Sequence, residues 1–250
     1  MLQPDGGEPF PKVSLKKYKP LSKLLPSFEQ FMTTNPPSSA TPVSLEAIDL
    51  PPRSSATDAP AFAQMVLIHG WGANYRDLVP VAEALGRPSV HYWFPNAPFP
   101  HPQVPGGGSW FDLEGFEGVD DSSRLLEQWL LGLESKSGIP LEKTVLAGFS
   151  QGGAMSLRVG LGLMPRLAGI VCLSGFWVGE PADNSSDEPL PPVLMVHGRR
   201  DPVVAIAYAY QARRKLEEQN VNVQFHEIDA MHEIPAEAIA LTSEFLDNLS

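Results

Sequence analysis

Short apolar runs, each bounded by glycine, proline or polar residues, recur along the chain from about residue 64 to its end. Runs of this length that are rich in Val, Ile and Leu are typical of strands buried on both faces of a sheet. The last run alternates apolar and polar residues, as a strand with two different faces does. The pattern predicts six strands, near 64–68, 90–94, 143–147, 169–173, 192–196 and 222–228.

Helical spacing of apolar residues fills most of the intervals between these runs. The clearest helix extends from Asp120 to Glu134, where leucines and Trp129 form an apolar stripe, which is core rather than a cofactor site. Further helices are predicted near 75–85, 151–162, 205–219 and 235–248. The alternation of strands and helices predicts an α/β fold with a mostly parallel central sheet flanked by helices.

The segment V-L-A-G-F-S-Q-G-G-A, from Val145 to Ala154, places a serine between glycines after a predicted strand and before a predicted helix. Such a strand-to-helix turn strains the backbone at the serine and lifts its hydroxyl above the sheet. Gly148 and Gly152 remove side chains that would collide there. Ser150 is therefore the candidate nucleophile, and a plain Gly-Ser turn is the alternative reading.

Two candidate partners follow Ser150 in the chain, each just past a predicted strand. Asp201 ends the polar loop after 192–196, and His232 lies in the loop after 222–228. A serine hydroxyl needs an imidazole to take its proton and a carboxylate to orient that imidazole. The order Ser, Asp, His is that of the α/β-hydrolases, whose parallel sheets place such loops at one edge.

Each partner also has a simpler interpretation. Asp201 precedes a proline and could be a turn residue, and His232 could cap the last helix. Asp229 and Glu233 are the other carboxylates near the histidine, but they flank it too closely in sequence to be obvious orienters. All three residues are expected just past strands at the same edge of the sheet, which favours Ser150, Asp201 and His232 as a catalytic triad.

Serine hydrolysis also needs N–H donors for the oxyanion of the tetrahedral intermediate. The amide after the nucleophile, that of Gln151, would be the first donor. The second would come from the turn H-G-W-G at 69–72, which follows the strand at 64–68 and frees the amide of Trp71. Taken alone, this turn could equally be a glycine turn that leads into the next helix.

With these motifs in order, the chain resembles the carboxylesterase/phospholipase family of small serine hydrolases, which includes the acyl-protein thioesterases and bacterial short-chain carboxylesterases. The resemblance covers residues 63–250 and includes S-W-F-D at 109–112, G-F-S-Q-G-G at 148–153 and L-S-G at 173–175. It implies a minimal α/β-hydrolase fold without a large cap domain. It also implies that Ser150, Asp201 and His232 form the triad and that the Trp71 and Gln151 amides form the oxyanion hole.

The segment from Pro98 to Phe111 resembles the loop over the family's acyl-binding groove, so Trp110 and Phe111 are expected to line that groove. The further candidate substrate contacts are His69, Gly70, Gly72, Met155, Phe176 and Trp177. One departure from the family is Met231, which stands where the family usually has glycine before its catalytic histidine. The loop is expected to approach the site differently, and the substrate shape could change with it.

The function expected from these residues is that of a serine carboxylic-ester hydrolase acting through an acyl-enzyme on short to medium acyl esters. Lysophospholipids and acyl thioesters are alternative substrates. A non-catalytic α/β-hydrolase scaffold or binding protein is the alternative from another class. The predicted chemistry requires no cofactor.

Composition and charge narrow the class of partner. The net charge is −11, and it belongs to the chain after residue 60, because residues 1–60 contain six Lys or Arg and six Asp or Glu. Such an acidic body disfavours nucleic acid and anionic membranes. No apolar stretch long enough for membrane insertion and no secretory signal is found, so a cytoplasmic enzyme is expected. The resemblance leaves a homodimer open.

Cysteine usage excludes two other types of chemistry. Cys172 is the single cysteine, so no internal disulfide forms, and its apolar surroundings indicate a buried thiol rather than a nucleophile. No Cys pair or closely spaced His pair suggests a metal site.

The chain divides into an extension, residues 1–60, and a catalytic domain, residues 61–250. The extension holds 11 of the 26 prolines, which interrupt helices and favour extended or disordered chain. Within it, Pro20 to Met32 has apolar residues at roughly helical spacing and could dock on the domain, cover the groove or touch lipid, or else be a partly ordered linker. The segment from Asn35 to Pro60 is expected to be a flexible connector.

Overall fold

A seven-stranded sheet forms the centre of the computed structural model, which describes residues 44–54, 62–179 and 188–249. The strand order is β1-β3-β2-β6-β7-β8-β9, and every pairing is parallel except that of β1 with β3. The strands are β1 (Ala47–Leu50), β2 (Gln64–Ile68), β3 (His91–Pro95), β6 (Thr144–Phe149), β7 (Gly169–Leu173), β8 (Val193–Gly198) and β9 (Val223–Ile228). The mostly parallel α/β fold is therefore confirmed.

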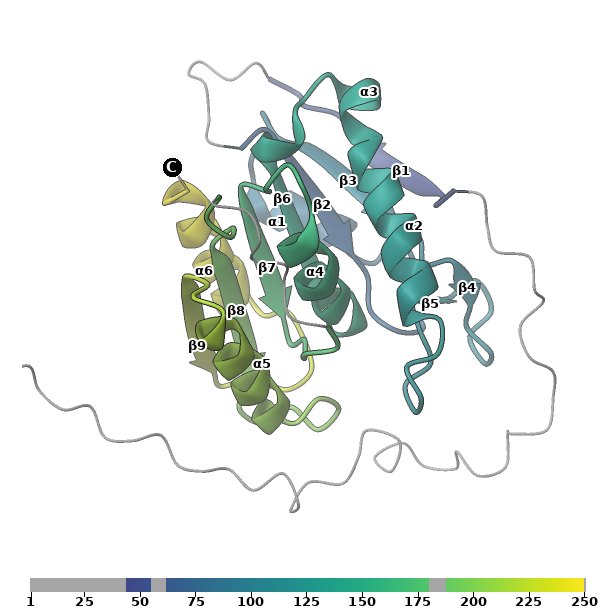
Figure 1. The fold of residues 1–250 in the computed structure, drawn as a ribbon, viewed down its shortest axis with the longest axis vertical. Coiled ribbons are helices and arrows are strands. Elements are labelled where there is room, and N and C mark those ends of the chain that lie inside the picture. The colour runs from purple at the N-terminus through teal and green to yellow at the C-terminus, as the bar shows by residue number, and fades with distance from the viewer. Residues whose placement is uncertain (1–43, 55–61, 180–187, 250) are drawn as a thin grey trace, which may run out of the picture.

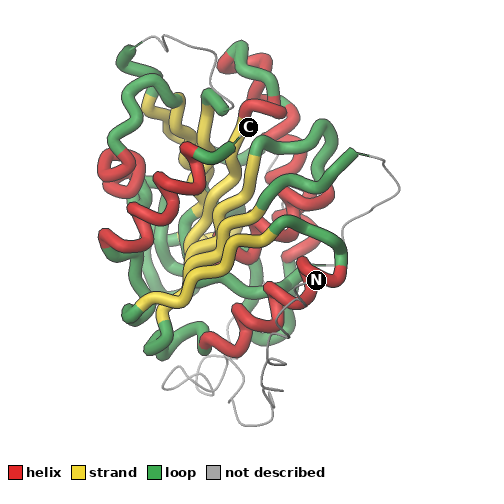
Figure 2. The backbone as a smooth tube through the Cα atoms, turned by 90° about the vertical axis from the view of Figure 1, so that its left-hand side faces the viewer, coloured by secondary structure: helices red, strands yellow, loops and turns green. Residues whose placement is uncertain are grey.

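Helices cover both faces of this sheet (Figures 1 and 2). The helices α2 (Val119–Leu131), α4 (Gln151–Gly162) and α5 (Ile206–Glu218) lie on one face. The helices α1 (Val79–Leu85) and α6 (Ala236–Asp247) pack together on the other. Two short helices, α3 (Leu133–Ser137) and η4 (Leu141–Lys143), connect α2 to β6, and no large cap is found among the described residues.

The apolar runs divide their side chains between two cores because successive strand residues point to opposite faces. In β2, for example, Val66 and Ile68 join the core under α2 and α4, whereas Met65 and Leu67 join the core under α1 and α6. All five residues of β2 are buried. Covered central strands of this kind are what the continuous apolar runs predict.

The strand β1 corrects one expectation. The segment from Asn35 to Pro60 was expected to be a flexible connector, but Ala47–Leu50 pairs antiparallel with β3, from Ala47 opposite Pro95 to Leu50 opposite Tyr92. The sheet therefore begins before residue 61. Residues 1–43, including the predicted docking segment from Pro20 to Met32, lie outside the described residues.

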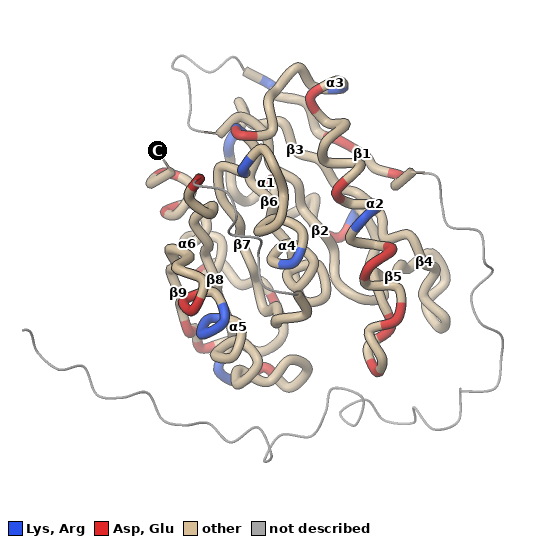
Figure 3. The backbone as a smooth tube through the Cα atoms, in the orientation of Figure 1, with Lys and Arg blue, Asp and Glu red and all other residues tan. Residues whose placement is uncertain are grey.

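Charged side chains are distributed unevenly over this frame (Figure 3). Carboxylates gather on α2 and the loop before it, where Glu114, Glu117 and Asp120 are exposed. On α5, Arg213, Arg214 and Lys215 each pair with a glutamate of the same helix. The described surface therefore offers no unneutralised basic stripe on α5 for a nucleic acid.

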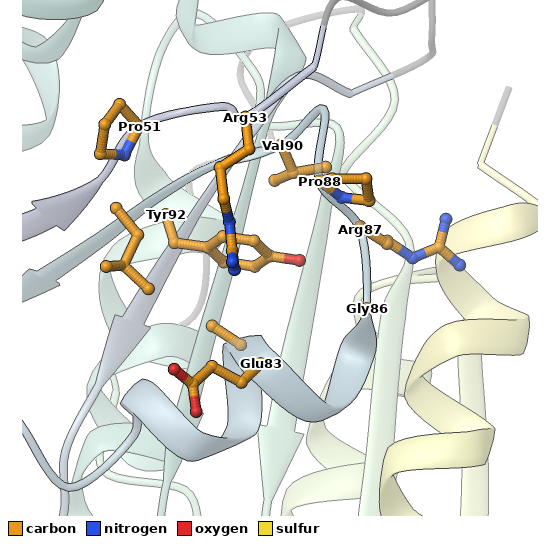
Figure 4. Close-up of a pocket in the computed structure, with 10 residues that line it drawn as sticks. Pro51, Arg53, Glu83, Gly86, Arg87, Pro88, Val90 and Tyr92 are labelled. Carbon is orange, nitrogen blue, oxygen red and sulfur yellow. The ribbon is translucent and has the colours of Figure 1, made fainter.

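A cavity of about 250 Å³ lies between the end of β1, the end of α1 and the start of β3 (Figure 4). Its walls include Arg53, Glu83, Arg87 and Tyr92. Because Tyr92 stands near the amino end of β3, this cavity is at the opposite edge of the sheet from the loops that follow β6, β8 and β9.

Candidate active site

Ser150 occupies a sharp turn between β6 and α4, with φ 56° and ψ −117°. A positive φ is uncommon for a residue with a side chain and stores strain that the surrounding structure must hold. The neighbouring backbones lie too close to tolerate side chains, because a Cβ on Gly148 would lie 2.2 Å from the carbonyl oxygen of Gly152. A Cβ on Gly152 would lie 2.1 Å from that of Ile68. The glycines of the motif are thus required by space.

The structure brings Ser150, His232 and Asp201 into one chain of hydrogen bonds. Nε2 of His232 lies 2.9 Å from Oγ of Ser150, and Nδ1 lies 2.6 Å from Oδ2 of Asp201. Since an ionised carboxylate can only accept, Nδ1 carries the proton and donates to Asp201. In the neutral imidazole, Nε2 is then free to accept the proton of the Ser150 hydroxyl.

Asp201 is held as a carboxylate. Its side chain is fully buried, and Oδ1 accepts hydrogen bonds from the amides of Val203 and Val204, both at 2.8 Å. Burial opposes ionisation, but the hydrogen bond and charge interaction with His232 and the two amides outweigh it, so the pKa of Asp201 lies below its usual value. Asp201 is therefore charged at neutral pH.

The other carboxylates near the histidine have different contacts. Asp229 forms a surface ion pair with Arg200 at 2.8 Å, and both side chains are exposed. Glu233 accepts a hydrogen bond from the amide of Met231, at 3.4 Å. Neither has a hydrogen bond to His232 in the described part of the chain, which leaves Asp201 as its partner.

A second histidine, His197, lies beside Asp201 and was not among the candidates drawn from the sequence. Its Nε2 donates to the carbonyl oxygen of Val204 at 2.8 Å and lies 3.6 Å from Oδ2 of Asp201. Burial lowers the pKa of His197, so its ring is neutral. In the sequence, only the motif H-G-R-R-D, which places His197 four residues before Asp201, could have indicated that His197 packs beside this carboxylate.

The turn at 69–72 lies directly against Ser150. A Cβ on Gly70 would lie 3.3 Å from Cβ of Ser150. The amide of Trp71 donates no backbone hydrogen bond to the residues that the structure describes. Gln151 is the first residue of α4, and the first amides of a helix have no partner within it. Both amides are therefore available, as the oxyanion prediction requires.

Trp110 and Phe111 are expected to line the acyl-binding groove, and in the described structure both side chains are buried, with 0% and 1% exposure. The side chain of Gln151 fixes their backbone: Oε1 accepts from the amide of Trp110 at 2.9 Å, and Nε2 donates to the carbonyl of Phe111 at 2.7 Å. The indole of Trp110 donates to the carbonyl of His69 at 3.0 Å. These hydrogen bonds attach Trp110 and Phe111 to Gln151 and to the turn at 69–72.

The other candidate substrate contacts divide into buried and partly exposed residues. Met155 and Phe176 also belong to the buried core, so their side chains do not reach the surface of the described structure. His69 is buried, with Nε2 accepting from the amide of Ala97 at 3.0 Å and Nδ1 donating to the carbonyl of Gly70 at 2.8 Å. Both of its ring nitrogens are occupied within the protein. Trp177 and the Trp71–Gly72 turn are partly exposed and stay candidate contacts.

Met231 does not keep His232 from the site. Its side chain is 53% exposed, while the His232 imidazole lies against the ring of Phe149 with centroids 4.7 Å apart. A Cβ on Gly198 would lie 2.5 Å from the carbonyl oxygen of Met231, so the loop sits closely against the end of β8. That Met231 changes the shape of substrate that the site accepts, relative to the family, stays a prediction.

Two kinds of chemistry have no candidates among the described residues. No group of three His, Cys, Asp or Glu side chains there could hold a metal ion. Burial raises the pKa of the Cys172 thiol to about 12, which excludes it as a nucleophile near neutral pH.

Within the described residues, no helix has the length and apolar character needed to cross a membrane.

Residues 53–250 match the sequence model of a family described as phospholipase/carboxylesterase. Among individual relatives, acyl-protein thioesterase 1 of Candida albicans is 28% identical over 233 residues, which cover 83% of this chain and 99% of that protein. Acyl-protein thioesterase 1 of Cryptococcus neoformans is 33% identical over 184 residues, which cover 65% of this chain and 74% of that protein.

Solved structures agree with these matches. The crystal structure of esterase PE8 superposes with a TM-score of 0.74 at 30% identity and covers 83% of this chain and 100% of its own. The carboxylesterase of Bacillus cereus superposes with a TM-score of 0.69 at 19% identity and covers 83% of this chain and 96% of its own. At that identity, the second match concerns the fold alone.

Proposed function

This chain belongs to the phospholipase/carboxylesterase family of serine hydrolases, and from that premise we propose that it cleaves short to medium acyl esters through an acyl-enzyme on Ser150. The observation that carries the proposal is the continuous hydrogen-bond chain from Ser150 through His232 to Asp201. A serine with a strained backbone and a hydrogen-bonded imidazole is what nucleophilic catalysis requires.

In the proposed reaction, Oγ of Ser150 attacks the ester carbonyl carbon while Nε2 of His232 takes the hydroxyl proton. Negative charge then develops on the carbonyl oxygen, and the amides of Trp71 and Gln151 donate hydrogen bonds to it. The ester C–O bond breaks as His232 gives its proton to the leaving alcohol. Water repeats the sequence on the acyl-enzyme and releases the acid, with Ser150 regaining its proton.

The carboxylate of Asp201 acts on this reaction through His232. It fixes the tautomer with the proton on Nδ1 and stabilises the imidazolium that forms when Nε2 is protonated. Its buried position and its two backbone amides hold it in one orientation. A scaffold without catalysis has no need of this arrangement, which is our reason for favouring the enzyme over the binding protein.

Substrate choice within the class is a proposal. The fold without a large cap favours an open approach for small esters, and the partly exposed Trp71 and Trp177 offer apolar contact. The relatives named acyl-protein thioesterase favour acyl thioesters as the second candidate. Lysophospholipids are the third candidate.

The test is turnover of a graded substrate set by the wild type and by Ser150→Ala. The set comprises p-nitrophenyl esters with acyl chains from acetyl to palmitoyl, an S-palmitoylated peptide and lysophosphatidylcholine. We expect the highest kcat/KM for short to medium esters and a loss of several orders of magnitude in kcat for Ser150→Ala. Ser156→Ala is the matched control, because that hydroxyl bonds only the carbonyl of Gly152 within α4.

Two outcomes would contradict the proposal. Ester turnover by Ser150→Ala close to that of wild type would remove Ser150 from the mechanism. A kcat/KM for the acylated peptide well above that of every ester would replace the ester proposal by the thioesterase one. A cytoplasmic location and a homodimer stay predictions, and light scattering of the purified chain tests the second.

A further inference from the structure

His101 is a buried histidine close to the catalytic machinery that the proposed mechanism does not use. It follows β4 (Phe99–Pro100), which pairs with β5 (Gly108–Ser109) to form a small two-stranded sheet. The segment from β4 to β5 packs against the turn that carries Trp71. His101 is 7% exposed, so it is part of the interior.

The tautomer of His101 follows from its hydrogen bonds. Nδ1 accepts from the amides of Gln103 and Val104, at 3.1 and 2.9 Å. A nitrogen that accepts from two amides carries no proton, so the neutral ring has its proton on Nε2. Burial also lowers the pKa of His101, which favours the neutral ring.

The Cδ2–Nε2 edge of this ring faces the turn of the proposed oxyanion hole. The rings of His101 and Trp71 are 4.1 Å apart at an angle of 68°, an edge-to-face contact. A Cβ on Gly72 would lie 3.4 Å from Cδ2 and 3.5 Å from Nε2 of His101. Nε2 is buried without a conventional hydrogen-bond partner among the described residues, and the ring edge that carries it faces Gly72.

Backbone hydrogen bonds join the same two segments. The amide of Gly72 donates to the carbonyl of Gly108 at 2.9 Å, and the amide of Gly108 donates to the carbonyl of Ala73 at 2.7 Å. A Cβ on Gly107 would lie 2.3 Å from the carbonyl oxygen of Gly72. The β4–β5 segment and the turn thus form one packed unit, with His101 between them.

We propose that His101 is a positioning residue, whose neutral ring holds the Trp71 side chain and thereby fixes the Trp71 amide where the oxyanion forms. The inference rests on the proposed function. An N–H donor helps the transition state only when it is aimed in advance, and small displacements of such groups reduce the rate strongly. His101 therefore acts through Trp71 and makes no contact with the reacting atoms.

A double-mutant cycle on ester hydrolysis tests this coupling. We expect His101→Ala to lower kcat about 10- to 100-fold, with KM changed less than about threefold, because the oxyanion forms only in the transition state. Trp71→Ala, which keeps the backbone amide, should lower kcat by a similar factor and also raise KM, because it removes an apolar substrate contact as well. The kcat of the double variant should be no lower than that of the slower single variant, because both changes remove the contact between His101 and Trp71.

His91→Ala is the matched control. His91 also packs on a tryptophan, with its ring 4.4 Å from that of Trp93, but it stands at the start of β3, away from the carboxyl edge. Its removal should leave kcat unchanged. Thermal unfolding of each variant distinguishes a protein that no longer folds from a folded protein in which the Trp71 amide is displaced.

Two further variants divide the contacts of His101. His101→Phe keeps a ring against Trp71 and loses the acceptor, and we expect it to retain kcat within about fivefold. His101→Asn keeps an acceptor for the two loop amides, as an Asx-turn does, but loses the ring, and we expect it to be as slow as His101→Ala. The opposite ranking would overturn the proposal, because the loop turn alone would then explain the effect.

Multiplicative losses in the double variant would also overturn it, as would wild-type kcat in His101→Ala. These outcomes differ from a failure of the proposed function, in which wild type and Ser150→Ala turn over esters equally and the role assigned to His101 fails with it. Active wild type with an unaffected His101→Ala rejects the positioning role alone.

Discussion

Nδ1 of His232 lies 2.6 Å from Oδ2 of Asp201, and these residues are 31 positions apart in the chain. The other oxygen of the carboxylate is occupied by the amides of Val203 and Val204. The two oxygens therefore have separate tasks. One fixes the carboxylate in its loop, and the other orients the imidazole.

Replacing this carboxylate by an amide tests the division directly. Asp201→Asn can keep its oxygen on the two loop amides, but its NH2 group then faces Nδ1 and favours the wrong histidine tautomer. We expect kcat for an ester to fall by about 10³- to 10⁴-fold, as tautomer loss does in serine hydrolases generally. Steady-state kinetics at neutral pH provide the measurement.

Asp229→Asn is the control for this experiment, because Asp229 lies near His232 in sequence but pairs with Arg200 at the surface. It should keep wild-type kcat. A mild loss of kcat in Asp201→Asn together with a severe loss in Asp229→Asn would contradict the assignment of Asp201 as the residue that orients His232.

The glycine at position 152 has no room for a side chain. Gly152→Ala would place a Cβ 2.1 Å from the carbonyl oxygen of Ile68 and 2.6 Å from that of His69, and neither backbone atom can move without disturbing β2 and its turn. We expect a loss of at least about 1–3 kcal/mol in unfolding free energy and of most activity. Urea denaturation and ester turnover provide the two measurements.

Gly162→Ala is the matched change in the same helix, since a Cβ there would have no atom within 4 Å. It should be neutral or stabilising by up to about 1 kcal/mol, because alanine favours helix over glycine. Equal effects of the two substitutions would contradict a steric role for Gly152.

Much of this fold was predictable because local signals and tertiary structure agree. Each of the six predicted strands exists within about two residues of its expected range, and the candidate triad residues follow β6, β8 and β9 as expected. Buried parallel strands need continuous apolar runs, and the serine turn needs its glycines, so both leave clear patterns in the sequence.

The strand β1 was missed because its stability comes from its partner. Ala47–Leu50 is only four residues long and lies in a proline-rich segment, and nothing in its own composition specifies pairing with β3. Pairing also brings Asp49 to His91, with Oδ2 2.7 Å from Nε2, and buries the nearby Leu45. Such contacts across the chain have no local sequence signal.

This strand leads to a prediction about truncation. A chain that begins at residue 44 keeps β1, whereas one that begins at residue 51 loses the edge strand, the burial of Leu45 and the contact between Asp49 and His91. We expect the shorter chain to have a Tm lower by several degrees. Equal Tm values by calorimetry would mean that β1 adds no stability and that the domain begins after it.

The burial of the aromatic residues near the site has no local sequence signal either, for a related reason. Trp110 and Phe111 sit in a loop beside the nucleophile, a position typical of groove walls, but the side chain of Gln151 and the carbonyl of His69 draw the loop inward. His101 gave no signal, because its importance depends on which ring packs against it. Sequence patterns locate the reacting groups better than the residues that support them.

Buried histidines make the stability of the fold depend on pH. Burial lowers the pKa of His69, His101 and His197 in the folded state, whereas the unfolded chain keeps ordinary values near 6.5. Below about pH 6.5 the unfolded state binds protons that the folded state does not, so the free energy of unfolding should decrease as pH falls.

Urea denaturation at pH 7.5, 6.5 and 5.5 measures this dependence. His197→Gln removes one of these three groups and should lose less stability over that range than wild type does. Wild-type stability that is constant or rises from pH 7.5 to 5.5 would contradict the assignment of neutral buried rings.

The central claim, an assembled and accessible Ser150 nucleophile, is tested most directly with a fluorophosphonate probe. The full-length chain is incubated with the probe before and after heat denaturation, and the adduct is mapped by mass spectrometry. Only a serine activated by its histidine reacts readily, so we predict label on Ser150 in the native protein and none after denaturation. Absence of label from native protein, or equal label on denatured chain, would contradict the proposed mechanism.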